Sequence, residues 1–157
     1  MISKPISQQI QIITDLIEKR LGLIAVKSTI TDHIPAYPYV SFTVMNVNYR
    51  KGTYGRESDE TRFLPVTIPI SFTVQSDKDT ECWEKVQALR DLFVQGTELA
   101  DLGVIVGDVG SITARDNILT VEYEYRKGFD VTINALDIIN QSDGVDGYID
   151  TVATVKE

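Results

Sequence analysis

Between Leu64 and Val74 every second residue is apolar, and the residues between them are Pro, Thr or Ser. A strict period of two indicates a half-buried β-strand, because successive side chains leave opposite faces of the backbone. Run from Phe63 to Gln75 at roughly 3.3 Å per residue, such a strand is about 43 Å long. A compact chain of this length has a diameter near ~40 Å. We therefore expect at least one end of the strand to extend beyond the core, where it can contact another molecule.

Two prolines, Pro65 and Pro69, lie within this predicted strand. Both lack the backbone N–H, and residues four apart direct that group toward the same side of a strand. One side has therefore lost two hydrogen-bond donors, which predicts an edge strand or a strand paired only in part on that side. The prolines could prevent edge-to-edge aggregation, contribute to a contact between subunits, or do both.

Composition sets broad limits on the class of protein. The chain has 157 residues, of which 43% are hydrophobic and 24% charged, and its formal net charge is −8. These values suit one soluble domain spanning residues 1–157, with no membrane span and no signal peptide, made in a cytoplasm. The acidic balance argues against a general nucleic-acid-binding protein, whose affinity comes from Lys and Arg. It suits a soluble protein, or one that lines a conduit through which DNA passes without binding.

Apolar residues at helical spacing predict two amphipathic helices. The first runs from Pro5 to Leu21 and ends at Gly22; the second runs from Thr80 to Gln95, is capped by Asp79 and ends at Gly96. The apolar stripe of the second helix consists of Cys82, Val86, Leu89 and Phe93.

The remaining patterns predict strands. We expect a short strand at 23–28, and a strand at 39–47 that pairs antiparallel with the long strand through a hairpin tip at 48–62. Short β segments are expected around 104–106 and 111–113, between glycines. The predicted fold is α+β: a mainly antiparallel sheet with a long protruding hairpin, packed against two amphipathic helices.

The apolar residues from Leu119 to Ala135 are all odd-numbered, and the phase continues across Arg126-Lys127-Gly128. Two structures keep this parity: one long strand bent at Gly128, or a hairpin with a three-residue loop. Beyond about residue 141 the chain is an extended acidic segment, in which 148–155 can form a last strand.

Little in the sequence indicates catalysis. The single histidine, His33, lies in a proline-flanked loop, and no Gly-x-Ser-x-Gly motif supplies a nucleophile. Cys82 belongs to an apolar helix stripe, which favours a buried side chain over a reactive thiolate. The glycine-rich segment 103–110 lacks both the dinucleotide-binding spacing and the P-loop lysine. We therefore expect no catalytic residue, no metal site and no cofactor.

The predicted tip at 48–62 has the composition of an interaction site. It is slightly positive on an acidic protein and contains two tyrosines, and Tyr and Arg dominate interface hot spots. The candidate partner-contact residues are Tyr49, Arg50, Lys51, Tyr54, Arg56 and Arg62. A solvated loop is the alternative, and contact with single-stranded nucleic acid through the tyrosines is a weaker one.

The order of elements, with the segments 37–42, 123–133 and 148–152, resembles the neck or tail terminator proteins of long-tailed bacteriophages. The similarity covers nearly the whole chain. Its motifs are an Arg-x-x-x-Asp strand, from Arg126 to Asp130, and an Ile-x-x-Val finish. The resemblance favours one long strand through Gly128.

This resemblance implies a structural virion protein without enzymatic activity, whose copies form a ring that ends the tail tube and joins the tail to the head–neck complex. A hexamer is the expected ring size. Implied partners are further copies of the chain, the tail tube protein and head-completion or neck proteins, with genomic DNA passing through the lumen without specific binding. The subunit-contact candidates are Pro65, Pro69, Arg126 and Asp130. The alternatives are another head–tail connector or tube protein, or a module that binds a small ligand or single-stranded nucleic acid.

Overall fold

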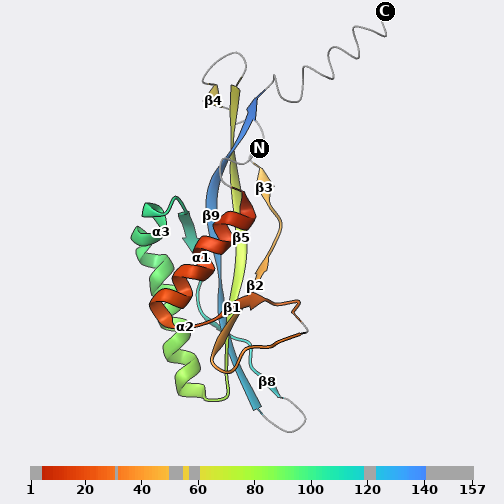
Figure 1. The fold of residues 1–157 in the computed structure, drawn as a ribbon, viewed down its shortest axis with the longest axis vertical. Helices are drawn as coiled ribbons and strands as arrows, with labels where there is room; N and C mark the ends of the chain where they lie inside the picture. Colours follow the sequence, from red (N-terminus) through yellow and green to blue (C-terminus); the bar gives the residue numbers. More distant parts are fainter. Residues whose placement is uncertain (1–4, 31, 50–54, 57–60, 119–122, 141–157) are drawn as a thin grey trace, which may run out of the picture.

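The two longest strands, β5 (Thr61–Ser76) and β9 (Tyr123–Asn140), pair antiparallel along all sixteen residues of β5 in the computed structural model (Figure 1). The long strand predicted from the alternating pattern is therefore present, and it is extended at both ends. The structure describes residues 5–30, 32–49, 55–56, 61–118 and 123–140.

The alternating pattern of β5 separates its two faces as predicted. Its buried apolar side chains are those of Val66, Ile68, Ile70, Phe72 and Val74. Residues directly opposite each other in an antiparallel pair share a face. The odd-numbered residues of β9 join them, because Phe129 lies opposite Phe72 and Ile133 opposite Ile68.

The prediction that β5 is an edge strand is wrong, because β5 is bonded on both sides. Its second side faces three shorter antiparallel strands. These are β2 (Tyr39–Val44), β3 (Asn48–Tyr49) and β4 (Gly55–Arg56).

The alternative expectation, pairing only in part on one side, agrees with the register. Pro65 and Pro69 fall between the stretches of β5 that pair with β2, β3 and β4. The carbonyl of Pro69 accepts a hydrogen bond from the Met45 N–H at 2.8 Å, so this residue directs its polar atoms toward the interrupted side. The missing N–H groups thus leave the ladder with β9 intact.

The central path of the sheet runs β1-β2-β5-β9-β6, with two further short strands, β7 and β8, along β9. β1 (Ala25–Lys27) is parallel to β2, while β6 (Ile105–Val109) is antiparallel to β9. β7 (Thr113–Ala114) and β8 (Asn117–Ile118) pair with the first part of β9. The fold is α+β with a mainly antiparallel sheet, as predicted.

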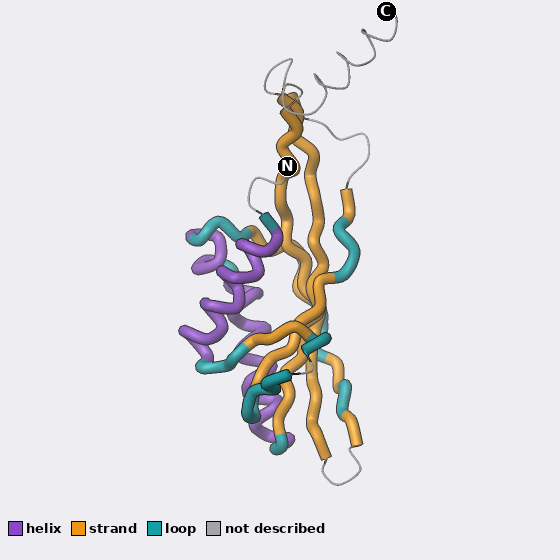
Figure 2. The backbone as a smooth tube through the Cα atoms, turned by 45° about the vertical axis from the view of Figure 1, so that its right-hand side comes forward, coloured by secondary structure: helices purple, strands orange, loops and turns teal. Residues whose placement is uncertain are grey.

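The three helices in the described part of the chain lie on one side of the sheet (Figure 2). They are α1 (Ile6–Leu21), α2 (Asp79–Gln95) and α3 (Thr97–Asp101). The predicted stops are confirmed: Gly22 and Gly96 follow α1 and α2 with φ of 67° and 63°, a left-handed conformation that glycine adopts without a Cβ clash.

The predicted capping role of Asp79 is wrong. Asp79 is the first residue of α2, and Lys78 occupies the N-cap position without a side-chain hydrogen bond to the helix. The Asp79 carboxylate instead lies 3.0 Å from the Nζ of Lys127 on β9, so a tertiary ion pair replaces the local cap.

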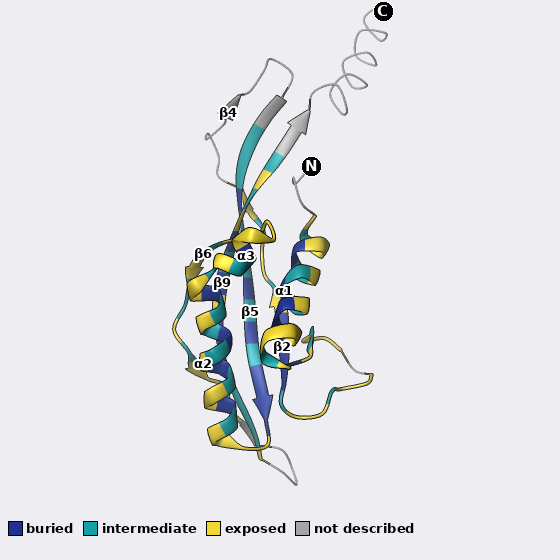
Figure 3. Cartoon of the chain, turned by 60° about the vertical axis from the view of Figure 1, so that its left-hand side comes forward, coloured by how far each residue is buried: buried dark blue, intermediate teal, exposed yellow. Residues whose placement is uncertain are grey.

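Phe72 is the centre of the core between sheet and helices. Its ring centroid lies 5.0 Å from that of Phe93 on α2, and 6.2 Å from those of both Phe42 and Phe129. The buried residues of α2 are the four predicted ones, and Figure 3 shows their side facing the sheet. The core therefore joins α2 to the middle of the β5–β9 pair.

β2, β3 and β4 pair antiparallel with β5, as expected for the predicted hairpin. Residues 50–54 and 57–60 lie outside the described residues, so the protrusion of the tip stays a prediction. The acidic segment from 141 and the last strand at 148–155 also lie outside them.

β9 is one continuous strand through Gly128, so the hairpin alternative at 126–128 is wrong and the resemblance indicated the correct structure. Gly128 lies opposite Thr73, inside the ladder. A Cβ at this position would lie 2.3 Å from the Phe72 carbonyl oxygen and 2.7 Å from Nη1 of Arg115. The close approach of two backbones and a crossing arginine requires glycine here.

Gly128→Ala should therefore lower the free energy of unfolding by about 1–3 kcal/mol, the usual cost of overpacking. Chemical denaturation followed by circular dichroism measures the effect. Asn134→Ala, at an exposed position of the same strand and face, is the matched control and should change stability by less than about 0.5 kcal/mol. Equal stabilities for the two variants would contradict this reading of Gly128.

Candidate assembly surface

The predicted partner-contact residues are only partly within the described chain. Tyr49 lies on β3 with 48% of its surface exposed. Arg56 on β4 is directly opposite Arg62 on β5, so the backbone brings these two positions together. Arg50, Lys51 and Tyr54 lie outside the described residues. The contact loop therefore stays a prediction.

The four subunit-contact candidates share one face of the β5–β9 pair. Pro65 and Pro69 are odd-numbered on β5, while Arg126 and Asp130 are even-numbered on β9, and these two sets point away from Phe72. We call this side, which none of the described helices covers, the open face (Figure 2). The structure thus places on one face residues from two distant segments; Pro69 lies two positions from the level of Asp130, whereas Pro65 and Arg126 are ten positions apart along the pair.

One half of the open face carries apolar side chains. Met45 extends the β2 register opposite Pro69, and Leu136 lies opposite Pro65. The exposed fractions of Met45 and Leu136 are 39% and 44%. Exposed large apolar groups between short polar ones are typical of the centre of a protein interface.

The other half is polar and is organised by Arg115, which the sequence analysis missed. Its Nη1 donates to the hydroxyl oxygens of Ser71 and Thr73, each at 2.9 Å. Its Nη2 donates to Oδ1 of Asp130 at 3.3 Å. The guanidinium therefore lies across β5 and β9 and holds the side chain of Asp130. No local pattern around Arg115 could have indicated the contacts across the sheet, because Ser71 and Thr73 lie more than forty residues away in the sequence.

Arg126, the fourth candidate, lies beside a second carboxylate. Its Nε is 3.5 Å from Oε1 of Glu124, and Oε2 of Glu124 accepts a hydrogen bond from the Tyr37 hydroxyl at 2.5 Å. Burial raises the pKa of the neighbouring Tyr39, Glu124 raises it further, and Arg126 opposes them. Charges of both signs therefore occupy this end of the sheet.

Lys127 is a buried charge at the start of β9. Its Nζ donates to Oδ1 of Asp116 at 2.6 Å and lies 3.0 Å from Oδ1 of Asp79. The same atom is 5.2 Å and 5.3 Å from the ring centroids of Trp83 and Tyr125. This lysine joins the first turn of α2, the β7–β8 connection and β9. Its odd number, in phase with the buried residues of β9, was a signal in the sequence that it faces the core.

The pKa shifts of Asp116 and Lys127 both favour the charged forms that make up their ion pair. Burial would raise the pKa of Asp116, but the hydrogen bond from Lys127 and that from the Arg126 N–H outweigh it and lower this pKa. Burial would likewise lower the pKa of Lys127, but hydrogen bonds to Asp116 and Asp79 raise it. The carboxylate therefore stabilises the fold above its unfolded pKa near ~4, and this contribution is lost as the pH falls through the lower folded value.

The two residues considered for catalysis do not form a site. Cys82 is fully buried, and burial raises the pKa of its thiol to about 11, so the thiol is protonated at neutral pH. His33 is exposed in its loop. Across the described residues, no group of three or more His, Cys, Asp or Glu side chains is placed to hold a metal ion.

Comparison with protein families identifies the chain. The family model described as phage neck terminator protein matches residues 8–157. The chain belongs to this family. No curated protein matches it. The resemblance seen in the sequence is thereby confirmed, and as a phage neck terminator family member the protein is a structural component of the phage neck. None of the described helices has the length and apolar character needed to cross a membrane.

Asp116→Asn should lower the free energy of unfolding at pH 7 by roughly 1–2 kcal/mol, because Lys127 loses its closest charged partner. The gap between wild type and variant should narrow as the pH falls below about 4, where the unfolded chain takes up a proton at Asp116 before the folded protein does, because the pKa of the folded carboxyl is lowered. Thermal denaturation at pH 7 and at pH 3 measures both differences. Asp91→Asn, on the exposed side of α2, is the control; a gap that does not depend on pH would contradict the ion-pair assignment.

Proposed function

We propose that this phage neck terminator protein acts without catalysis, as a ring of identical subunits that ends the tail tube and joins the tail to the head–neck complex. Six subunits are the expected ring size. The family supports the neck location. The observation that supports the ring is the open face, which the four subunit-contact candidates from two distant segments share along its length.

A closed ring requires a heterologous contact, in which one surface of a subunit meets a different surface of the next. The open face offers an apolar half around Pro65, Pro69 and Leu136, and a charged half around Arg115 and Asp130. On contact with a neighbouring subunit, the apolar half would bury apolar surface, and the charged half would fix how the two subunits align. The helix side of the sheet presents a different surface to the neighbour.

The loop at 48–62 is proposed as the contact with the tail or head partners. Two of its short strands, β3 and β4, pair with β5 on the interrupted side. Tyr49, near the start of the loop, is half exposed. The loop's positive charge would attract acidic partner surfaces, while the net charge of −8 would let genomic DNA pass through the ring without binding. Tail tube protein and head-completion proteins are the proposed partners.

Thr67→Arg tests the ring contact. Thr67 lies on the open face between the two prolines and opposite Asn134, so a long cation there would prevent close approach of a neighbour. We expect the variant to lose oligomers that the wild type forms at high concentration, by mass photometry or native mass spectrometry, with an unchanged melting temperature. Gln87→Arg, the same type of change at an exposed position of α2, should leave the oligomers intact. Equal oligomer masses for Thr67→Arg and wild type would exclude the open face.

Charge reversal of Arg50, Arg56 and Arg62 to Glu tests the partner contact. The triple variant should fold normally, because the described core is built from apolar residues elsewhere in the chain, but should fail to join heads and tails. Complementation of a phage lacking its terminator, scored as infectious particles, should fall at least about a hundredfold. Normal particle yield from the triple variant would refute the role of the loop.

A further inference from the structure

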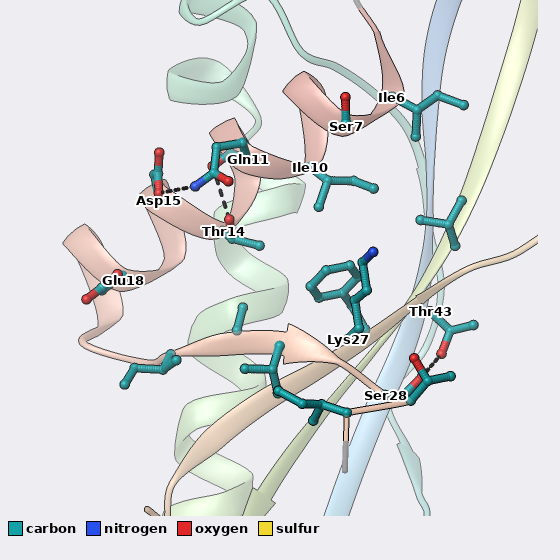
Figure 4. A pocket seen from close by; sticks show the side chains of 17 residues that line it. Ile6, Ser7, Ile10, Gln11, Thr14, Asp15, Glu18, Lys27, Ser28 and Thr43 are labelled. Carbon is teal, nitrogen blue, oxygen red and sulfur yellow. Dashed lines mark hydrogen bonds between the residues drawn. The ribbon is translucent and has the colours of Figure 1, made fainter. Parts of the chain in front are cut away.

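A groove with a volume of about 870 Å³ lies between α1 and the strands β1 and β2 (Figure 4). Ile6 and Ile10 point from α1 toward the strands, and Phe42 and Val44 of β2 also line it. The apolar lining of the groove comes from the predicted helix stripe. Ile13 and Ile17 of this stripe are buried in the core, whereas Ile6 and Ile10 are covered only in part. The first half of α1 therefore keeps an apolar face that the sheet does not fill.

The groove borders an open edge of the sheet. β1 ends the strand order, and within the described part of the chain it pairs only with β2. Ile24 and Ser28 form backbone hydrogen bonds toward β2, so Ala25 and Lys27 between them direct their N–H groups away from it. Ile24 and Ile30 are 50% and 38% exposed beside this edge. An unpaired strand edge next to apolar side chains is the arrangement that binds an extended peptide by strand addition.

We propose that this groove binds residues 148–155 of a neighbouring copy of the chain, added as a strand along β1. The segment reads Tyr-Ile-Asp-Thr-Val-Ala-Thr-Val, and five of its eight residues are β-branched, which favours extended structure. Backbone groups of Ala25 and Lys27 would bond the added strand, and its apolar side chains would cover Ile10 and Ile24. The inference rests on the proposal that copies of this chain assemble.

The register of the sheet argues for a neighbour rather than the same chain. Asn140, the last residue of β9, lies opposite Thr61, while Val26 is level with Thr73 through Ser41. Twelve residues of strand at ~3.3 Å and three strand spacings of ~4.8 Å separate Asn140 from Val26 by about 42 Å. Tyr148 follows Asn140 by eight residues and can reach at most about 29 Å. The first half of the segment therefore cannot reach Val26 of its own chain, whereas the tail of an adjacent subunit starts from a different position.

Disulfide cross-linking between full-length variants tests the inference. Ile24→Cys in one preparation is mixed with Val152→Cys or Ala153→Cys in another; adjacent residues of a strand point to opposite faces, so one of the two tail positions faces Ile24. The native Cys82 is fully buried and stays in place. After mild oxidation we expect at least about fivefold more cross-linked dimer than with Gln87→Cys, an exposed position on α2, in place of Ile24→Cys.

The outcomes separate this inference from the proposed function. A double variant that carries Ile24→Cys and a tail cysteine in the same chain provides the comparison. If it cross-links only within the chain, and the mixtures give no dimer, the tail occupies its own groove and the inference is overturned. No cross-linking above the Gln87→Cys level would overturn it too, whether or not oligomers are present. The proposed function is judged independently, by head–tail joining in the complementation assay.

Discussion

The antiparallel pair of β5 and β9 is the interaction on which the rest of this structure depends. Its continuous ladder aligns Phe72 with Phe129 and Ile68 with Ile133, and the helices pack on the apolar face that results. Of the other described strands, all except β1 bond directly to one of these two strands. The ladder requires Gly128 on β9, because the Phe72 carbonyl leaves no room for a Cβ there. A single backbone pairing thus determines where the core, the open face and the short strands lie.

The two sides of β5 differ, and this difference shapes the proposed assembly surface. Toward β9 every residue is paired; toward β2, β3 and β4 the pairing is interrupted at Pro65 and Pro69. The prolines therefore interrupt the pairing on one side of β5 without weakening the central ladder. Their side chains, with Met45 and Leu136, leave an apolar area on the open face of the sheet, away from the described helices. A neck protein that assembles with identical copies needs such an area to be exposed in the free subunit.

Buried and half-buried charged side chains link neighbouring segments at the end of the sheet where β9 begins. Lys127 joins three chain segments through Asp116 and Asp79, and Arg115 crosses β5 and β9 on the other face. Both cations bond to groups that are distant in sequence. In a low-dielectric environment such networks contribute specificity as well as stability when their partners are satisfied. A rigid end of this kind would suit a subunit that must keep its shape while neighbours bind along the sheet.

The sequence alone determined the elements that depend on local periodicity. These include the long strand, the two main helices with their glycine stops, the α2 stripe and the family, since alternation and helical spacing are properties of short segments. Tertiary structure decided what periodicity cannot express. It placed β5 in the interior of the sheet, selected the continuous strand at Gly128, and recruited Asp79 to Lys127 in place of a helix cap. The physical reason is that hydrogen-bond partners and charge partners more than forty residues apart are chosen by the packing of the whole chain, and a local pattern carries no information about that choice.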